Sequence, residues 1–431
     1  MHLYSLFQKH PIVCTDSRNC PEGSIFFALK GDNFNANAFA LSALENGCAY
    51  AVVDEQEYAI DKRFVLVDNV LGALQQLATC HRKHLGTKII GITGTNGKTT
   101  TKELIAAVLK EKYNILYTQG NLNNHIGVPL TLLALKPEHE LAVVEMGANH
   151  PGEINMLCEI ACPDFGIITN VGKAHLEGFG SFEGVKKTKA ELYQYIFKHG
   201  KKIFLNKDNE HLNEMAGNAG FTGNSRTVEY SMAGNDAAVK ADITSCSPFL
   251  NMNCRIMEAS FEVNTHLIGS YNAENVLAAA TIGNYFGLAN EEIKAGLENY
   301  EPQNNRSQLT ITKHNKVVVD AYNANPTSMK AAILNFAQMD VNGKTLILGD
   351  MLELGEQSRL EHRNIVELLQ QNKFSNVFLV GKEFKQTENP FACFADADTL
   401  AEYLEKNPVN NQYILLKGSR GIRLEKVLKT L

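Results

Sequence analysis

The stretch Lys88–Thr101, KIIGITGTNGKTTT, decides the fold of this chain. A short apolar strand runs into the glycine-rich turn GTNGKTT, and a helix with its apolar residues on one stripe follows. Small residues let backbone N–H groups approach phosphate oxygens, and the start of a helix presents a positive dipole end to an anion. The pattern therefore predicts a phosphate-binding loop.

The residue types in this loop suit a nucleotide phosphate. Lys98 is placed to contact the β- and γ-phosphates, and the Thr99 hydroxyl is placed to bind Mg²⁺. The match to the general form G-x4-G-K-[ST] is imperfect, because residue 92 is isoleucine and the nearest glycines are Gly91 and Gly94. The alternative is a glycine-rich turn with a solvated lysine, and the flanking strand and helix favour the phosphate loop.

Length and composition set the class of protein. At roughly 150 residues per domain, 431 residues predict about three domains. Hydrophobic residues make up 44% and charged residues 20%, which excludes a wholly disordered, collagen-like or coiled-coil chain. The net charge is -6, from 41 basic and 47 acidic residues, so we expect no nucleic-acid partner.

The chain also lacks the patterns of secretion and membrane insertion. Its first residues carry no basic run followed by an apolar core, and no later stretch approaches about 18 consecutive apolar residues. We therefore expect a cytoplasmic protein without membrane insertion, and we expect a monomer.

Nine cysteines are scattered along the chain without a CxxC pair, so the sequence predicts neither a disulfide framework nor a zinc ribbon. Cys158 and Cys162 have the spacing of one helical turn and could flank a metal. Because no second ligand pair lies nearby, we interpret them as small buried apolar residues.

The alternation of strands and helices changes along the chain. Residues 1–85 predict a small α/β domain, and residues 86–301 predict a mostly parallel sheet with helices on both faces. Within the second part, short polar and apolar pieces from about Asp236 to Leu267 predict an antiparallel edge. The first domain is expected to contain strands at Ser24–Leu29, Ala49–Asp54 and Phe64–Val67 and a helix at Val70–His84.

A further break lies at Glu301–Asn305, where proline and amide residues interrupt the helical pattern. Residues 302–431 again alternate strands with helices, which predicts a smaller Rossmann-like domain. Its expected strands are Lys316–Asp320, Thr345–Gly349, Asn376–Val380 and Tyr413–Lys417, and its expected helices are Ser328–Gln338, Leu360–Gln371 and Thr399–Lys406.

Two polar residues follow neighbouring strands of the central domain. Glu145 ends the strand Leu141–Glu145, and His175 comes shortly after the strand Phe165–Asn170. Taken alone, Glu145 could be a solvated strand end and His175 a structural hydrogen-bonding residue. Because parallel strands deliver their carboxyl ends to one edge, we expect both to meet Lys98 there as metal ligands.

Six motifs carry a resemblance to a known family. They are GITGTNGKTTTKE (91–103), TQGNLNNHIGVPLTLL (118–133), EMGANHPGEI (145–154), NVGKAHLEGFGSFEGVKKTKAEL (170–192), DAYNANPTSM (320–329) and GDMLELGEQS (349–358). In this order, over nearly the whole chain, they resemble the Mur ligases of peptidoglycan synthesis.

The resemblance implies an α/β protein of three domains: a small N-terminal α/β UDP-binding domain (1–85), a central P-loop ATPase with a mostly parallel sheet (86–301) and a C-terminal Rossmann-like domain (302–431). It implies ATP as co-substrate and two Mg²⁺ ions. The implied reaction joins D-Ala-D-Ala to UDP-N-acetylmuramoyl-tripeptide through an acyl phosphate.

The resemblance also assigns residues to ATP and metal. Lys189 aligns with a lysine that is carbamylated in several relatives, which would turn a cation into an anionic metal ligand; the alternative is a plain lysine that binds substrate or water. The implied metal ligands are Thr99, Glu145, His175 and Lys189. The implied ATP-binding residues are Gly94, Thr95, Asn96, Gly97, Lys98, Thr99, Thr100, Asn275, Arg306 and Asp320. Lys98, His175, Lys189 and Arg306 are the implied catalytic residues.

Substrate-binding residues follow in the same way. Ser17, Arg18, Lys30 and Gly31 resemble the family's uridine-diphosphate site, although Asn35-Ala36-Asn37 departs from the pattern Asp-Gly-His common in relatives. Asn123 and Asn124 are expected to face the peptide near the metals. Tyr322, Asn323 and Asn325 suit either the dipeptide and nucleotide or the cap of the helix that begins near Ser328.

Two other functions remain open from the sequence. One is a sibling ligase that adds a different amino acid, against which the absence of the DNPR motif weighs. The other is a nucleotide-dependent switch without catalysis, against which the presence of Glu145, His175 and Arg306 weighs.

Overall fold

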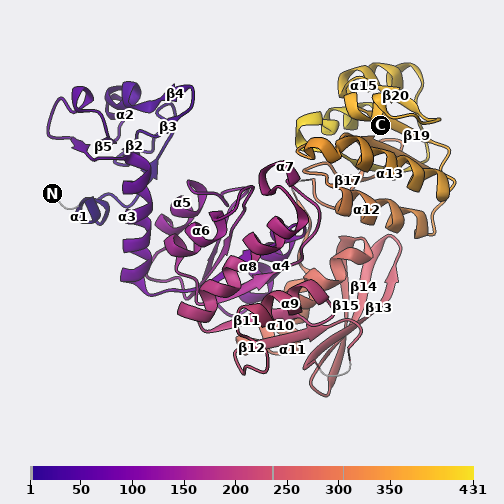
Figure 1. Cartoon of the computed structure of the whole chain (residues 1–431), viewed down its shortest axis with the longest axis horizontal. Coiled ribbons are helices and arrows are strands. Elements are labelled where there is room, and N and C mark those ends of the chain that lie inside the picture. The colour runs from indigo at the N-terminus through magenta and orange to yellow at the C-terminus, as the bar shows by residue number, and fades with distance from the viewer. Residues whose placement is uncertain (1–2, 235–236, 304) are drawn as a thin grey trace.

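The structure is a computed structural model that describes residues 3–234, 237–303 and 305–431. Asp236 and Asn304, which fall in segments discussed above, lie outside the described residues. Three α/β units follow one another along the chain, and the first and third lie at opposite ends of the central one (Figure 1). None of the helices in the described ranges is long and apolar enough to cross a membrane.

The N-terminal unit is a four-stranded parallel sheet. Its strand order is β1 (Val13–Cys14), β2 (Ile25–Phe27), β5 (Tyr50–Val53) and β6 (Phe64–Leu66). Helix α2 (Ala40–Glu45) covers one face, and α1 (Leu3–Phe7) and α3 (Val70–Leu85) cover the other. A hairpin of β3 (Lys30–Gly31) and β4 (Phe34–Asn35) lies beside the sheet.

Helix α3 joins this unit to the central one (Figure 1). It begins after the N-cap Asn69, whose side chain accepts from the Gly72 N–H, and it ends at Gly86, which has φ 68°. Beyond the first sheet it packs on α5 (Gly127–Leu133) and α6 (Glu153–Ala161) of the central unit.

The central unit contains a nine-stranded sheet. Its order is β15 (Ala259–Ile268), β14 (Phe249–Ile256), β13 (Val239–Cys246), β12 (Thr227–Ser231), β11 (Lys202–Asn206), β10 (Phe165–Ile168), β7 (Lys88–Thr93), β9 (Leu141–Glu145) and β8 (Ile115–Tyr117). Strands β8 to β13 run parallel, and β13, β14 and β15 pair antiparallel. The expected antiparallel edge is therefore confirmed.

Helices cover both faces of this sheet, as the apolar strands require. One face is covered by α4 (Lys98–Lys110), α10 (Ala273–Tyr285) and α11 (Asn290–Glu298). The other is covered by α5, α6, α8 (Phe182–His199) and α9 (Glu210–Asn218). The short helix α7 (Leu176–Phe179) precedes α8.

The C-terminal unit is a six-stranded sheet that is parallel except at β16. Its order is β16 (Gln308–Ile311), β17 (Lys316–Asp320), β21 (Tyr413–Lys417), β18 (Lys344–Gly349), β19 (Val377–Val380) and β20 (Ala392–Phe394). Its helices are α12 (Pro326–Gln338), α13 (Ser358–Gln371), α14 (Lys382–Gln386) and α15 (Ala397–Lys406). The expected α/β class and its largely parallel sheets are thus confirmed.

The strand order of the central sheet positions the site. After β7 the chain continues through α4 to β8 and β9 on one side, and then crosses to β10 on the other side. The connections therefore diverge beside β7, which leaves a crevice outside the carboxyl ends of β7, β9 and β10. The phosphate loop, Glu145 and the segment that leads to His175 start at these strand ends.

Candidate active site

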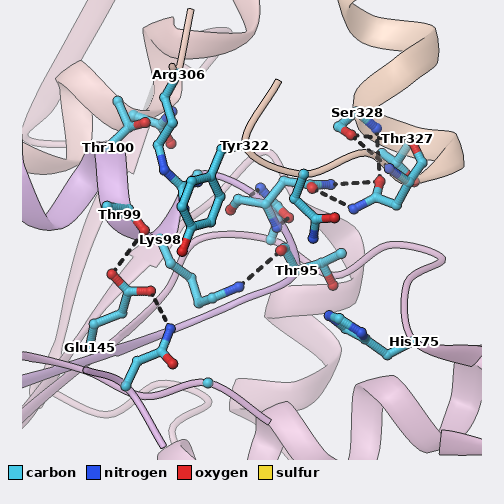
Figure 2. A pocket seen from close by; sticks show the side chains of 18 of the residues that line it. Thr95, Lys98, Thr99, Thr100, Glu145, His175, Arg306, Tyr322, Thr327 and Ser328 are labelled. Carbon is cyan, nitrogen blue, oxygen red and sulfur yellow. Dashed lines mark hydrogen bonds between the residues drawn. The ribbon is translucent and has the colours of Figure 1, made fainter. Parts of the chain in front are cut away.

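A cleft of about 840 Å³ lies between the central and C-terminal units. Residues that follow β7, β9 and β10 line it on one side, and residues around the start of α12 line it on the other (Figure 2). The predicted site residues in its lining are Thr95, Asn96, Gly97, Lys98, Thr99, Thr100, Asn123, Asn124, Glu145, His175, Asn275, Arg306, Asp320, Tyr322, Asn323 and Asn325. Lys189 is buried nearby, within electrostatic range of Lys98 and His175.

The loop after β7 is shaped by the loop after β10. Gly94 has φ 146°, and a Cβ there would lie 2.0 Å from Thr169 Oγ1, so glycine is required. The Thr95 N–H donates to the Asn170 carbonyl at 2.9 Å, and the Asn96 N–H donates to Asn170 Oδ1 at 2.9 Å. These contacts present the N-terminus of α4 to the cleft, where its dipole favours an anion.

Lys98 is the first residue of α4 and folds back over the loop. Its Nζ donates to the carbonyls of Gly94 at 2.7 Å and Thr95 at 3.0 Å. Burial lowers the pKa of Lys98 to about 8; Glu145 opposes this effect and the charge of Arg306 adds to it. A negatively charged group in the cleft would restore the charged form of this lysine.

Arg306 extends from the segment between the central and C-terminal units toward the same cleft. Its guanidinium carbon lies 3.7 Å from the centroid of the Tyr322 ring (Figure 2). Its Nε is buried and has no hydrogen-bond partner among the described residues. Lys98 and Arg306 thus place two basic side chains in the same cleft, and each can still donate a hydrogen bond. This arrangement suits a polyphosphate.

Glu145 lies at the end of β9, beside the start of α4, and is 1% exposed. The Thr99 hydroxyl donates to its Oε2 at 3.0 Å, and Asn123 Nδ2 donates to its Oε1 at 2.8 Å. Lys102 Nζ lies 3.9 Å from Oε2 and donates to the Thr118 carbonyl at 2.6 Å. A buried carboxylate beside a hydroxyl provides the hard oxygen ligands that Mg²⁺ prefers, so these residues fit the metal that the family implies.

His175 connects the central and C-terminal units. It has φ 47°, and its Nδ1 contacts Oε2 of Glu353. Burial is the main effect that lowers the pKa of His175, and Glu353 opposes it. The neutral imidazole that burial favours is also the form that binds metals.

Lys189 lies on α8, with its Nζ 5.5 Å from the centroid of the Phe179 ring. Burial lowers the pKa of Lys189 to about 7, and the nearby positive charge of Lys98 contributes to this lowering. At neutral pH a substantial share of this lysine is therefore a neutral amine. Only the neutral amine reacts with carbon dioxide, so the environment suits the carbamate expected from the resemblance.

The residues expected to contact the nucleoside occupy the remaining part of the cleft. Asn275 is largely engaged by the protein: its Nδ2 donates to Asn272 Oδ1 and its Oδ1 accepts from Thr101 Oγ1, both at 2.9 Å. Asp320, at the end of β17, accepts from Lys417 Nζ at 2.6 Å. Asp320 is thereby fixed in orientation at the carboxyl edge of the C-terminal sheet.

The alternative of helix capping applies to some of the asparagines. Asn325 Oδ1 accepts from the Ser328 N–H at 2.9 Å as the N-cap of α12, while its Nδ2 donates to Asn96 Oδ1 at 2.7 Å. Asn124 Oδ1 accepts from the backbone at the start of α5. Asn323 Oδ1 accepts from the adjacent backbone N–H at 2.9 Å. Contact of these residues with substrate stays a prediction.

The N-terminal candidates lie outside this cleft. They are Ser17, Arg18, Lys30 and Gly31. Arg18 is exposed and pairs with Asp16 at 2.7 Å, and Lys30 Nζ pairs with Asp54 at 2.8 Å and Glu55 at 2.7 Å. An anionic substrate would have to compete with these carboxylates, so uridine-diphosphate binding by these residues stays a prediction.

Asn35-Ala36-Asn37, which stands where relatives commonly have Asp-Gly-His, has a structural role in this chain. Asn37 is fully buried, and its Nδ2 donates to Asp54 Oδ1 at 2.8 Å. Asn35 Oδ1 accepts from the Asn37 N–H at 3.0 Å, and Asn35 Nδ2 donates to Glu55 at 3.1 Å. The side chains of Asn35 and Asn37 therefore hold the β3–β4 hairpin, which carries Lys30, against the loop that follows β5.

Sequence reasoning missed several residues near the site, among them Lys102, Glu353 and Lys417. Lys417 ends an apolar strand at a carboxyl edge, the same signal that identified Glu145. Lys102 is fully buried on α4 and Glu353 lies in a loop of another domain, so neither has a sequence pattern that reveals its partner.

Comparisons with known proteins show the family of this chain. The chain matches the family models described as "Mur ligase middle domain" over residues 92–283 and "Mur ligase, glutamate ligase domain" over residues 305–420. It is 35% identical to the UDP-N-acetylmuramoyl-tripeptide--D-alanyl-D-alanine ligase of Bacillus subtilis, covering 97% of this chain and 92% of that one. Identity to the enzyme of the same name from Escherichia coli is also 35%, with coverage of 97% and 93%.

Solved structures give the same result. The chain superimposes on MurF from Acinetobacter baumannii with a TM-score of 0.84 at 30% identity, covering 97% of this chain and 92% of that one. MurF ligase from Thermotoga maritima in complex with ADP gives a TM-score of 0.85 at 27% identity, with coverage of 97% and 96%. Since both domain models and near-full-length relatives match, this chain belongs to the Mur ligase family.

Proposed function

We propose that this chain is an ATP-dependent ligase that joins D-Ala-D-Ala to UDP-N-acetylmuramoyl-tripeptide and releases ADP and phosphate. The observation that carries the proposal is the cleft between two domains, which is lined by a glycine-rich loop, a buried carboxylate and Arg306. The buried Nε of this arginine has no hydrogen-bond partner among the described residues. The names of the near-full-length relatives supply the substrates. The ADP complex of a relative supports use of ATP.

The roles of the nucleotide-binding residues follow from the cleft. The loop from Gly94 to Thr100 would hold the phosphates, with Lys98 on the outer ones. Asn275 would contact the adenine and Asp320 the ribose, on opposite sides of the cleft. Arg306 would contact the terminal phosphate. Its guanidinium would then either keep its stacking on Tyr322 or give it up.

Two metal positions are part of the proposal. Thr99 and Glu145 would hold one Mg²⁺, and His175 with carbamylated Lys189 would hold a second. Bound Mg²⁺ would neutralise phosphate charge as a Lewis acid. The chain's own part is to fix these oxygen and nitrogen ligands, through Asn123 on Glu145 and through the burial of Lys189.

The reaction requires no nucleophile from the enzyme. A carboxylate oxygen of the tripeptide attacks the γ-phosphorus, the bond to ADP breaks, and an acyl phosphate forms. The amine of D-Ala-D-Ala then attacks the acyl carbon, a proton leaves the nitrogen, and inorganic phosphate departs from the tetrahedral intermediate. Lys98 and Arg306 stabilise the charge that develops on the transferring phosphoryl group.

The division into domains at 1–85, 86–301 and 302–431 stays part of the proposal. In it, Ser17, Arg18, Lys30 and Gly31 hold the uridine diphosphate end of the long substrate, while Asn123, Asn124, Tyr322, Asn323 and Asn325 surround its peptide end and the dipeptide. We place the reaction in the cytoplasm, because it consumes ATP and a UDP-linked precursor, and we propose a monomer.

Phosphate release from ATP, measured with each substrate omitted in turn, tests the function. Release is expected to require both UDP-N-acetylmuramoyl-tripeptide and D-Ala-D-Ala, and Lys98→Ala should lower the rate by on the order of 10³-fold. Lys110→Ala, at the exposed end of the same helix, is the matched control and should keep the rate. Release that ignores the dipeptide, or a Lys98→Ala enzyme near wild type with intact circular dichroism, would refute the proposal.

A further inference from the structure

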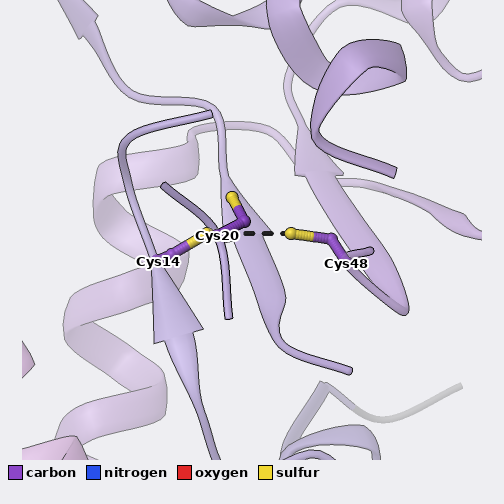
Figure 3. A group of neighbouring side chains, drawn as sticks. All are labelled: Cys14, Cys20 and Cys48. Atoms are coloured by element: carbon purple, nitrogen blue, oxygen red, sulfur yellow. Dashed lines mark hydrogen bonds between the residues drawn. The ribbon is translucent and has the colours of Figure 1, made fainter. Parts of the chain in front are cut away.

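Three cysteines that are far apart in the sequence meet in the N-terminal unit (Figure 3). Cys14 ends β1, Cys20 lies in the following loop, and Cys48 lies just before β5. Their Sγ atoms all lie within 4.8 Å of one another, and those of Cys14 and Cys48 are 3.7 Å apart. Among the described residues, no other three histidine, cysteine or acidic side chains gather their ligand atoms this closely.

The spacing of the sulfur atoms fits a tetrahedral metal. A Zn–S bond of about 2.3 Å in tetrahedral geometry separates two sulfur ligands by about 3.8 Å. The distance between Cys14 and Cys48 already has this value. Cys20 is partly exposed and lies in a loop, and its Sγ is within 4.8 Å of the other two sulfur atoms.

A serine hydroxyl lies beside two of the three sulfur atoms. The hydroxyl of Ser24, which is fully buried, lies 3.3 Å from Cys48 Sγ and 3.8 Å from Cys14 Sγ. Three sulfur ligands with an adjacent hydroxyl or water form a four-coordinate set. Since sulfur is a soft ligand, such a set selects Zn²⁺ and similar thiophilic cations over Mg²⁺.

All three cysteines are free thiols in this structure. A thiophilic cation displaces the thiol protons when it binds, because the thiolate is the form that ligates a metal.

We propose that Cys14, Cys20 and Cys48 form a binding site for one thiophilic divalent cation, with Zn²⁺ as the fitting ion. The site is separate from the cleft between the other two units, whose lining includes none of these cysteines. The loop between its first two ligands carries Ser17 and Arg18. A bound cation would therefore link this loop to the segment just before β5 and hold the loop in one conformation.

Titration of the reduced full-length chain with Co²⁺, in excess Mg²⁺, tests the proposal. One equivalent should produce the thiolate-to-cobalt charge-transfer band, and one equivalent of Zn²⁺ should remove it. Cys20→Ser should weaken Co²⁺ binding at least tenfold, whereas Cys80→Ser, a partly exposed cysteine on α3 outside the cluster, should leave it unchanged. Absence of the band, or equal loss in the two variants, would overturn the proposal.

Alkylation of the wild-type chain gives an independent readout that needs no variant. Zn²⁺ should slow the reaction of Cys20 with N-ethylmaleimide at least tenfold, as followed by peptide mass spectrometry. The reaction of Cys80 should keep its rate. An unchanged rate at Cys20 in saturating Zn²⁺ would refute the site.

Discussion

At the scale of single residues, the site is organised by cations that the fold has buried. Lys98 and Lys189 both lose much of their hydration, and the pKa values fall to about 8 and about 7. A folded protein keeps such residues at a cost to stability, because the unfolded chain hydrates the charged amine fully. That cost supports the proposal that Lys189 serves the chemistry of the site rather than packing.

Replacement of Lys189 by methionine should therefore stabilise the metal-free chain. Near pH 7 the gain should be on the order of a few kcal/mol, at about 1.4 kcal/mol per unit of pKa shift. The pKa of Lys189 is lower in the folded than in the unfolded state, so the unfolded chain binds more protons above pH 7. Wild-type stability should accordingly rise with pH, and the advantage of the variant should shrink toward pH 10.

Urea denaturation of both chains at several pH values, in buffer free of carbon dioxide, measures this difference. Ligase activity should be lost in the Lys189→Met variant while its stability rises. A difference in unfolding free energy that stays constant from pH 7 to pH 10 would show that Lys189 does not titrate as the structure indicates.

At the scale of elements, the junction between β7 and α4 depends on glycine for two separate reasons. Gly94 has a backbone conformation that L-residues rarely adopt, and it also lies against Thr169. Gly86, at the end of α3, has φ 68°, but a Cβ there would meet no atom within 4 Å. The two positions therefore separate the effect of conformation from the effect of close packing.

Gly94→Ala should lower ADP affinity at least tenfold, because the loop must move away from Thr169 and the N-terminus of α4 moves with it. Gly86→Ala should cost about 1 kcal/mol of stability, from backbone strain alone, and should leave ADP affinity within twofold. Calorimetric titration with ADP and urea denaturation measure the two effects. Full ADP affinity in Gly94→Ala would contradict the loop geometry described here.

At the scale of the whole molecule, polar contacts between side chains join the C-terminal unit to the central one. Lys173 Nζ pairs with Glu361 at 2.9 Å, and Asn96 bonds with Asn325 at 2.7 Å. Glu361 is 5% exposed, so loss of Lys173 would leave a buried carboxylate without its ion-pair partner. Apolar contacts join the two units as well, because Ile268 of β15 is part of the hydrophobic core of the C-terminal unit.

A charge reversal tests this arrangement. Glu361→Lys should open the molecule, because it places two cations opposite each other, and the radius of gyration from small-angle X-ray scattering should rise. The double variant Lys173→Glu with Glu361→Lys restores the attraction and should return the radius toward wild type. An unchanged radius in the single variant would show that this pair does not hold the domains together.

Much of the fold was predictable because its signals are local. The expected strands Leu141–Glu145, Lys316–Asp320 and Tyr413–Lys417 match β9, β17 and β21 residue for residue. Buried parallel strands are continuous apolar runs that end in a polar residue, and this pattern requires no knowledge of neighbours. The antiparallel edge at β13 to β15 was likewise predictable, because short polar and apolar pieces alternate along its sequence.

The candidate site was predictable where residues follow a strand or a glycine-rich turn, as Lys98, Glu145 and His175 do. It was not predictable where one domain supplies a partner to another. Nothing near Glu353 in the sequence indicates its contact with His175, and the scattered spacing of Cys14, Cys20 and Cys48 gave no sign that their sulfurs meet.

The sequence by itself determined the phosphate loop, the strand and helix pattern and the family, because each depends on residues close together in the chain. Only the tertiary structure decided which side chains pair across the cleft, which lysines lose their hydration and which cysteines become neighbours. The physical reason is that desolvation and hydrogen bonding depend on distance in space, and folding brings together groups that the chain order separates.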